Sequence, residues 1–413
     1  MASAIGGSDL GDAFTERSRI SGMVTHAVGR RTLLQLFAGV AVAGVPRFAG
    51  AVRDRIVIAG GGIIGANLAY RLARRGASVT LLERTRPASG ATANSFAWIN
   101  STYSKQPWAY FNLNRLGVEA WQQLNLELPG DLPLRWGGSV EWYGDDKRAA
   151  EFRGEIRHHQ AWGYPAHVID EMALRALEPQ ITPGKVAVAA HAEFEGSADP
   201  VRATEVLLAR AAGLGARIVH PAEVTGLDDR NGRLRAVRTT TGDIEADVLI
   251  VACGIDTPRV ASMAGVRVPL KDSPGVLVHT APQPRVLERV VLSPIAHMKQ
   301  KPDGRIVTGS GFGGTPSTDT SREVGERFLE TASQVLPAFT KSDVERVTLG
   351  LRPLPADEFP VIGFPPSRRD VYIAVMHSGV TLSPLVAHLA AIEILDSVEV
   401  EALAPYRPAR FNS

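Results

Sequence analysis

The sequence contains very little cysteine and histidine. Among its 413 residues there is one cysteine, Cys253, so a disulfide framework and a cysteine-based metal site are both excluded. The ten histidines show no H-E-x-x-H or similar ligand spacing, and we expect no metal site. The adjacent pair His158–His159 lies in a polar stretch, where we expect both side chains to be solvated.

The chain also lacks an excess of charge of either sign. It has 45 Lys and Arg against 43 Asp and Glu, a formal net charge of +2, and the basic residues are spread along its length. This balance argues against a nucleic-acid partner and against a polybasic membrane arm. With 45% hydrophobic and 21% charged residues, a chain of this length is expected to form two packed globular domains.

The sequence has no apolar run long enough to span a bilayer. Its most prominent apolar run lies near the start. Thr32–Val45 is too short to span a bilayer, so we expect no stable membrane span. It follows Arg30–Arg31 and is followed by Ala49-Gly50-Ala51, an order similar to a twin-arginine export signal. We expect residues 1–52 to be a leader that directs export to the periplasm. The alternative is an uncleaved tail on a cytoplasmic protein.

Glycine is plentiful, and three glycines carry the strongest motif, "IVIAGGGIIGANLAYRLARRGASVTLLER" (56–84). Gly60, Gly62 and Gly65 have G-x-G-x-x-G spacing between an apolar strand and an amphipathic helix. This context predicts a sharp turn, a backbone approach to a pyrophosphate, and close packing of helix on strand. Ile63 and Ile64 begin the helix, whose free N–H groups are expected to face the phosphates.

The residues after the second strand indicate which dinucleotide binds. Glu83 is placed to accept from a ribose hydroxyl and to repel a 2′-phosphate. The loop "RTRPASGATANS" begins at Arg84 and offers small residues and hydroxyls that suit a second approach to the pyrophosphate. The alternative for this loop is a surface turn. Its candidate cofactor contacts are Arg84, Ser89, Gly90, Ala91 and Thr92.

With these motifs and several that follow, the chain resembles the FAD-dependent amine oxidoreductase superfamily. This superfamily includes D-amino-acid oxidase, glycine oxidase, sarcosine oxidase and D-amino-acid dehydrogenase. The resemblance extends from Arg55 to about Leu395 and implies FAD as the cofactor. The pieces that carry it are "IAGGGIIGANLAYRLARRGASVTLLER", "ASGAT", "ALEPQI", "GSADPVRATEVL", "ADVLIVACGIDT", "KPDGRIVTGS", "GLRPLPADEFPVIG" and "HSGVTLSP".

The order of apolar strands and helices predicts an α/β fold. We expect a discontinuous, Rossmann-type FAD-binding domain and a substrate domain of mixed β-sheet plus helices. The expected FAD-binding segments are 53–133, 193–265 and 345–400, the substrate segments are 134–192 and 266–344, and residues 401–413 form a C-terminal tail.

The resemblance implies that Arg352, in "GLRP", grips a substrate carboxylate. A planar guanidinium suits this role because it makes two parallel charge-assisted hydrogen bonds to a carboxylate. The alternative is an ion pair with Asp357 or Glu358 on the same loop. His297 stands where many relatives carry an aromatic residue, and Tyr103, Tyr110, Trp142 and Tyr143 are further candidates for the substrate side.

The segment "HSGVTLSP" is expected at the other end of the site. Ser383 is predicted to cap a helix that begins at Pro384, with its positive end toward the flavin. His377, Ser378, Gly379 and Thr381 are the expected contacts there, and Gly254 follows a buried strand beside the cofactor. Since no cysteine lies near Arg352, we expect FAD to be bound non-covalently.

The expected function is oxidation of the C–N bond of a small amino acid or N-methyl amino acid, by hydride transfer to flavin N5. The resulting imine hydrolyses to a keto acid or an aldehyde, and the expected electron acceptor is O2 or a quinone. Two alternatives stay open: a 2-hydroxy-acid oxidoreductase of the same fold, and a flavin-binding partner subunit without turnover of its own.

Overall fold

The computed structural model describes residues 54–103, 105–309, 311 and 318–411. The chain divides at residue 52, and all described residues belong to the unit from Arg53 to Ser413. The expected leader, 1–52, lies outside the described residues. Among the helices that are described, none is both long and apolar enough to cross a membrane.

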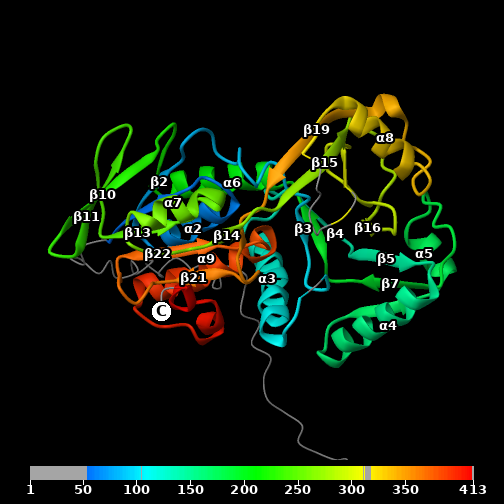
Figure 1. Ribbon diagram of the computed structural model, residues 1–413, viewed down its shortest axis with the longest axis horizontal. Helices are drawn as coiled ribbons and strands as arrows, with labels where there is room; N and C mark the ends of the chain where they lie inside the picture. The colour runs from blue at the N-terminus through cyan, green and yellow to red at the C-terminus, as the bar shows by residue number, and fades with distance from the viewer. Residues whose placement is uncertain (1–53, 104, 310, 312–317, 412–413) are drawn as a thin grey trace, which may run out of the picture. The chain divides into compact units, whose positions relative to one another are not determined.

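The first sheet has six strands in the order β21-β22-β13-β1-β2-β9 (Figure 1). Their bounds are β1 Arg55–Ala59, β2 Ser78–Leu82, β9 Arg217–Val219, β13 Val248–Val251, β21 Val361–Gly363 and β22 Val371–Val375. All neighbours pair in parallel except β21, which is antiparallel to β22. The expected Rossmann-type sheet is therefore present, and the loops after β1, β2 and β13 meet at its carboxyl edge.

Both faces of this sheet are covered, which explains why its strands are apolar throughout. Ile56 and Ile58 of β1 pack with one group of helices, whereas Val57 and Ala59 pack on the opposite face. The first group is α2 Ile63–Arg74, α3 Trp108–Glu127, α6 Pro200–Gly213 and α9 Gly379–Leu395. The opposite face carries α7 Thr257–Ser262 and a small sheet of β10 Val224–Arg230, β11 Arg233–Thr239 and β12 Ile244–Glu245.

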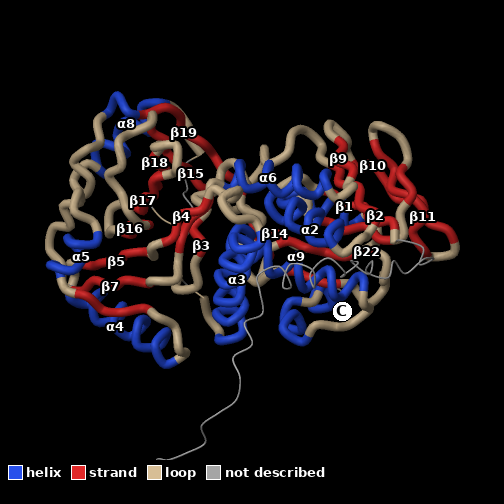
Figure 2. The backbone as a smooth tube through the Cα atoms, turned by 180° about the vertical axis from the view of Figure 1, so that it is seen from behind, coloured by secondary structure: helices blue, strands red, loops and turns tan. Residues whose placement is uncertain are grey.

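A second sheet has eight strands in the order β19-β15-β18-β17-β16-β5-β7-β6 (Figure 2). Their bounds are β5 Ser139–Tyr143, β6 Ala166–Ile169, β7 Val188–Ala192, β15 Pro274–Thr280, β16 Val290–Leu292, β17 His297–Gln300, β18 Ile306–Gly309 and β19 Val344–Leu351. The pairings are antiparallel except between β16 and β5. Helices α4 Asp146–Ala161, α5 Glu171–Leu177 and α8 Arg322–Ala332 contact it.

Shorter elements complete the described fold. They are the sheet β3 Trp98–Ile99, β8 Gly196–Ala198 and β4 Leu134–Trp136, the pair β14 Leu270–Lys271 and β20 Leu354–Pro355, and the 3₁₀ helices η1 Gly254–Asp256, η2 Lys341–Asp343, η3 Glu401–Tyr406 and η4 Pro408–Phe411.

The strands of each large sheet come from the chain segments expected for one domain. The exception is β19, which pairs with β15 in the eight-stranded sheet although most of it lies in segment 345–400. The division of the chain into these two domains stays a prediction.

The prediction that Ser383 caps a helix beginning at Pro384 is wrong. Helix α9 begins at Gly379, and Pro384 lies inside it. A proline there cannot donate to the carbonyl of Val380, four residues earlier. That carbonyl instead accepts from Trp121 Nε1 at 2.7 Å and from Ser383 Oγ at 3.0 Å. The hydroxyl of Ser383 therefore stabilises the helix around the proline.

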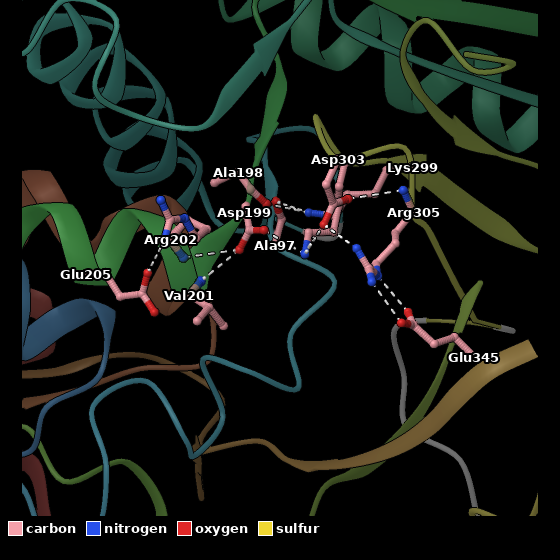
Figure 3. Close-up of polar contacts among 11 residues, drawn as sticks. Ala97, Ala198, Asp199, Val201, Arg202, Glu205, Lys299, Asp303, Arg305 and Glu345 are labelled. Carbon is pink, nitrogen blue, oxygen red and sulfur yellow. Dashed lines mark hydrogen bonds and ion pairs between the residues drawn. The ribbon is translucent and has the colours of Figure 1, made fainter. Parts of the chain in front are cut away.

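Lys299, on β17, and Lys301, in the turn after β17, connect the start of α6 to the second sheet. Asp199 and Lys299 are labelled in Figure 3. The Asp199 carboxylate caps α6, accepting from the N–H of Val201 at 3.1 Å and Arg202 at 3.2 Å. It also pairs with Lys301 Nζ at 2.6 Å. Lys299, which is 2% exposed, donates to the carbonyls of Ala198 at 2.6 Å and Ala97 at 3.3 Å.

Candidate active site

A cavity of about 460 Å³ extends between the carboxyl edge of the six-stranded sheet and the eight-stranded sheet. Its lining includes every predicted cofactor contact except Gly65, together with Arg352 and His297. These are Gly60, Gly62, Ile63, Ile64, Glu83, Arg84, Ser89, Gly90, Ala91, Thr92, Gly254, His297, Arg352, His377, Ser378, Gly379 and Thr381. Residues from widely separated parts of the chain are thus brought to one cavity.

The glycine-rich turn has the geometry that its spacing predicts. Gly60 has a φ of +111°, and a Cβ there would overlap the carbonyl of Ala252. A Cβ on Gly65 would overlap the carbonyl oxygen of Gly60, so Gly65 allows α2 to pack against the end of β1 rather than lining the cavity. The first turn of α2 therefore opens into the cavity through Gly62, Ile63 and Ile64.

Two side chains hold this turn in place. The Glu83 carboxylate accepts from the N–H of Gly61 and of Thr85, each at 2.9 Å. The Thr92 hydroxyl accepts from the N–H of Ile63 at 3.1 Å, in a buried contact that caps α2. The loop predicted to approach the pyrophosphate thus packs directly on the helix N-terminus.

The remaining charged residues at this end are paired with each other. Arg84 pairs with Asp256 at 2.5 Å, and Arg259 pairs with Glu223 at 2.9 Å. Cys253 also lines the cavity, where its thiol donates to the carbonyl of Ala59 at 3.2 Å. Burial raises the pKa of this thiol to about 12, so it is not a reactive thiolate at neutral pH.

Arg352 lies at the other end of the same cavity, directly after β19. Its guanidinium donates to the carbonyls of Ser273 at 3.3 Å and Pro274 at 3.0 Å, which orient the group. A Cβ on Gly275 would lie 3.4 Å from its Nη2, so this glycine leaves room for the guanidinium. Burial lowers the pKa of the Arg352 guanidinium below its usual value.

The two carboxylates proposed as rival partners of Arg352 are bound to other cations. Asp357 pairs with Arg410 at 2.6 Å, and Glu358 pairs with Lys271 at 3.0 Å. The carboxylates among the described lining residues are Glu83, Glu223 and Asp256, all engaged at the glycine-rich end. The Arg352 end of the cavity therefore favours an anion.

Two histidines near Arg352 are neutral at physiological pH. Burial and the charge of Arg352 lower the pKa of His297 to about 3. The pKa of His377 is lowered to about 3 by burial and by the charges of Lys105 and Arg352. Tyr103 completes this wall, and burial raises the pKa of its phenol above 10.0.

Lys105 is a site residue that the sequence did not indicate. Its ammonium is 8% exposed, lines the cavity and donates to Ser378 Oγ at 2.7 Å, while Tyr110 OH lies 2.9 Å from the same oxygen. Burial lowers its pKa to about 8. Lys105 follows a small-residue loop without any recognisable spacing, so no pattern distinguished it from a solvated lysine.

Three of the expectations for side chains around the site are corrected or refined. Trp142 is wrong as a substrate-side residue, because it is fully buried and donates to the carbonyl of Pro183 at 2.9 Å. Tyr110 does not line the cavity and acts through Ser378. His159 is not solvated, being 5% exposed and stacked on Phe111 at 5.5 Å.

The residues present fit a bound dinucleotide. The turn at Gly60 and Gly62 brings the backbone and a helix N-terminus to the cavity wall, where an anion is stabilised. Asn100 Oδ1 is buried in the same wall and accepts no hydrogen bond from the part of the protein that is described. A buried acceptor of this kind suits a polar ligand group.

Comparison with known proteins agrees with this geometry. The family model for FAD dependent oxidoreductases (DAO) matches residues 55–392. The hydrogen cyanide synthase subunit HcnC of Pseudomonas aeruginosa is 25% identical over 86% of this chain and 96% of its own length. Glycine oxidase of Geobacillus kaustophilus is 24% identical over 87% of this chain and 97% of its own length. Mouse mitochondrial dimethylglycine dehydrogenase is 24% identical over 79% of this chain and 41% of its own length.

Solved structures show the same fold. L-proline dehydrogenase from P. horikoshii superposes with a TM-score of 0.77 at 25% identity, covering 87% of this chain and 98% of its own. Glycine oxidase from Geobacillus kaustophilus superposes with a TM-score of 0.78 at 22% identity, covering 86% of this chain and 99% of its own. Because the family model spans most of the sequence, this chain belongs to the FAD dependent oxidoreductase (DAO) family, with FAD as its cofactor.

Proposed function

We propose that this protein oxidises the C–N bond of an amino acid or N-methyl amino acid whose carboxylate is held by Arg352. The observation that carries the proposal is the position of Arg352. Its guanidinium is half-buried in the cavity that the glycine-rich turn enters, and two backbone carbonyls orient it. Named relatives such as glycine oxidase and dimethylglycine dehydrogenase support this substrate class.

The electrostatics of the site support a small anion. Arg352 and Lys105 are cationic at neutral pH, whereas His297 and His377 are neutral. A carboxylate near Arg352 therefore gains charge-assisted hydrogen bonds without a competing acidic side chain. Fixing the substrate in this way supplies orientation, which is a large part of what a redox enzyme needs from its protein.

Bound FAD would supply the oxidant, an acceptor for the hydride that leaves the substrate carbon. Water would then hydrolyse the substrate imine to a keto acid and ammonia, or to an aldehyde and the demethylated amino acid when the oxidised carbon is an N-methyl group. The residues of the chain position the substrate and adjust charge. A group with a pKa of about 3 is a poor base at neutral pH, so we assign His297 to shaping the wall beside Arg352 rather than to proton transfer. The N-terminus of α9 and Lys105, which meet at Ser378, would favour negative charge in the bound cofactor.

The experiment is anaerobic mixing of the holoprotein with D-alanine, L-alanine, glycine, sarcosine, dimethylglycine and 2-hydroxyglutarate, while flavin absorbance is followed. We expect at least one amine to bleach the flavin and 2-hydroxyglutarate to leave it oxidised. Reduction by the hydroxy acid alone would overturn the proposal in favour of C–O oxidation. Inertness to every amine, with lysine, ornithine and arginine included in the panel, would favour a partner subunit without turnover.

The same experiment addresses the electron acceptor. After reduction is complete, air is admitted and the rate of reoxidation is measured, followed by a soluble quinone in a parallel sample. Rapid recovery in air would identify an oxidase, and recovery with quinone alone would identify a dehydrogenase.

A further inference from the structure

A second cavity adjoins the first and is unlike it in composition. Its volume is also about 460 Å³, and Tyr103 and Lys105 line both cavities. Polar residues of β5 and α4 also line the second cavity: Glu141, Tyr143, Arg148, Glu155 and His159. A ligand bound beside Arg352 therefore has an adjoining space that polar side chains line.

Among the described carboxylates that line this cavity, Glu155 accepts from Arg148, whereas Glu141 has no cationic hydrogen-bond partner. Its Oε1 accepts from the phenol of Tyr143 at 2.5 Å, and within the described part of the chain nothing donates to Oε2. The carboxyl lies deep in the protein, and burial raises its pKa to about 7. A carboxylate in this situation gains most from a ligand that brings a positive charge.

The cations around Glu141 are engaged elsewhere. Arg148 donates to Glu155 Oε1 at 2.6 Å and to Oε2 at 3.3 Å, and its guanidinium lies 4.4 Å from the centre of the Tyr143 ring. Lys105 donates to Ser378 Oγ. Glu141 is therefore left with a neutral phenol as its donor.

His159 adds a second polar group to the cavity wall. Its imidazole is 5% exposed, and within the described structure its Nδ1 has no hydrogen-bond partner. Burial lowers its pKa to about 4, so the ring is neutral. A neutral ring nitrogen that has no proton accepts a hydrogen bond, which suits an N–H donor.

We propose that the second cavity holds the distal end of the substrate, and that Glu141 binds a positively charged amino or guanidinium group there. The substrate class is then an amino acid with a basic side chain. This inference rests on the proposed function, because Arg352 is taken to hold the other end. Tyr103, which lines both cavities, lies along the path of the side chain between them.

The test uses ligands that bind without being oxidised, so that it does not depend on turnover. Dissociation constants are measured from perturbation of the flavin spectrum, and in parallel by calorimetry, for 4-aminobutanoate, 5-aminopentanoate and 6-aminohexanoate. Butanoate, pentanoate and hexanoate keep the carboxylate but lack the terminal ammonium, and glutarate carries a second carboxylate in its place. We expect one chain length to show at least tenfold tighter binding of the amino form than of the alkanoate, with glutarate weakest.

The matched variants are Glu141→Gln and Glu178→Gln. Glu178 is also buried, burial raises its pKa to about 7, and it does not line the cavity. In Glu141→Gln the preference for the amino form should fall to about twofold or less, while alkanoate affinity is kept. In Glu178→Gln the preference should be unchanged.

Equal binding of amino and alkyl ligands by the unmodified holoprotein would overturn the proposal, even if Glu141→Gln does not fold. A preference that survives in Glu141→Gln would also overturn it. The proposed function fails differently: the binding preference for the amino forms would persist while ornithine, lysine and arginine, in either chirality, all leave the flavin oxidised.

Discussion

Lys299 shows how strongly burial affects a single residue of this protein. Its ammonium donates to the carbonyls of Ala198 and Ala97 and lies 5.7 Å from the centre of the Phe96 ring. Burial lowers its pKa from 10.5 to about 7. The folded protein therefore binds this proton more weakly than the unfolded chain does.

This difference makes stability depend on pH. Between pH 7 and 10.5 the unfolded state binds more protons at Lys299 than the folded state, so the free energy of unfolding rises with pH across this window. We expect Lys299 to contribute a rise of roughly 2–4 kcal/mol, most of it between pH 7 and 9.5. Urea denaturation of the holoprotein at several pH values measures it.

The comparison is between Lys299→Met and Lys147→Met, since Lys147 is an exposed lysine on α4. The rise with pH should shrink in the first variant and persist in the second. Identical pH profiles for the unmodified protein and Lys299→Met would show that the buried ammonium does not perturb stability.

At the scale of elements, helix α6 depends on Asp199. This residue is 6% exposed and caps the helix (Figure 3). It also pairs with Lys301, from the turn between β17 and β18. Because α6 packs on α2, which carries the glycine-rich turn, the cap also supports the cofactor end of the cavity.

We expect Asp199→Ala to lower the free energy of unfolding by about 2–3 kcal/mol, because it removes a cap and the closer of the two carboxylates that pair with the partly buried Lys301. Asp199→Asn should lose less, since its amide oxygen still caps the helix. Glu205→Gln breaks an exposed pair with Arg202 on the same helix and should change stability by about 0.5 kcal/mol or less. Denaturant titrations of the three variants would refute this account if Asp199→Ala were as mild as Glu205→Gln.

The 3₁₀ segments at the C-terminus also belong to the core. Residues 401–413 are expected to be a tail, yet Leu403 and Tyr406 are buried. Arg407 donates to Glu393 of α9 at 2.8 Å, and Tyr372 of β22 donates to the same carboxylate at 2.7 Å. These contacts join the end of the chain to the last helix and the six-stranded sheet.

For the whole molecule, the α/β fold was predictable from the sequence, and most of the predicted cofactor contacts line the first cavity. The turn at Gly60 has the predicted geometry because local spacing determines how a strand, a turn and a helix connect. The ribose contact of Glu83 stays a prediction. The prediction failed at Ser383, where contacts from Trp121 compensate for a proline inside α9. The sequence did not indicate Lys105 or Glu141, whose roles depend on burial by distant segments.

The central claim is that Arg352 holds the substrate carboxylate in the cavity that binds FAD. The most direct test measures anaerobic flavin reduction by the best amino acid substrate and by the same amine without its carboxylate, in the unmodified protein and in Arg352→Met. We expect either change alone to slow flavin reduction at least 100-fold. Both changes together should slow it little more than either change alone, because they remove the same interaction. Equal reduction rates for the amino acid and its decarboxylated analogue in the unmodified protein would contradict the account.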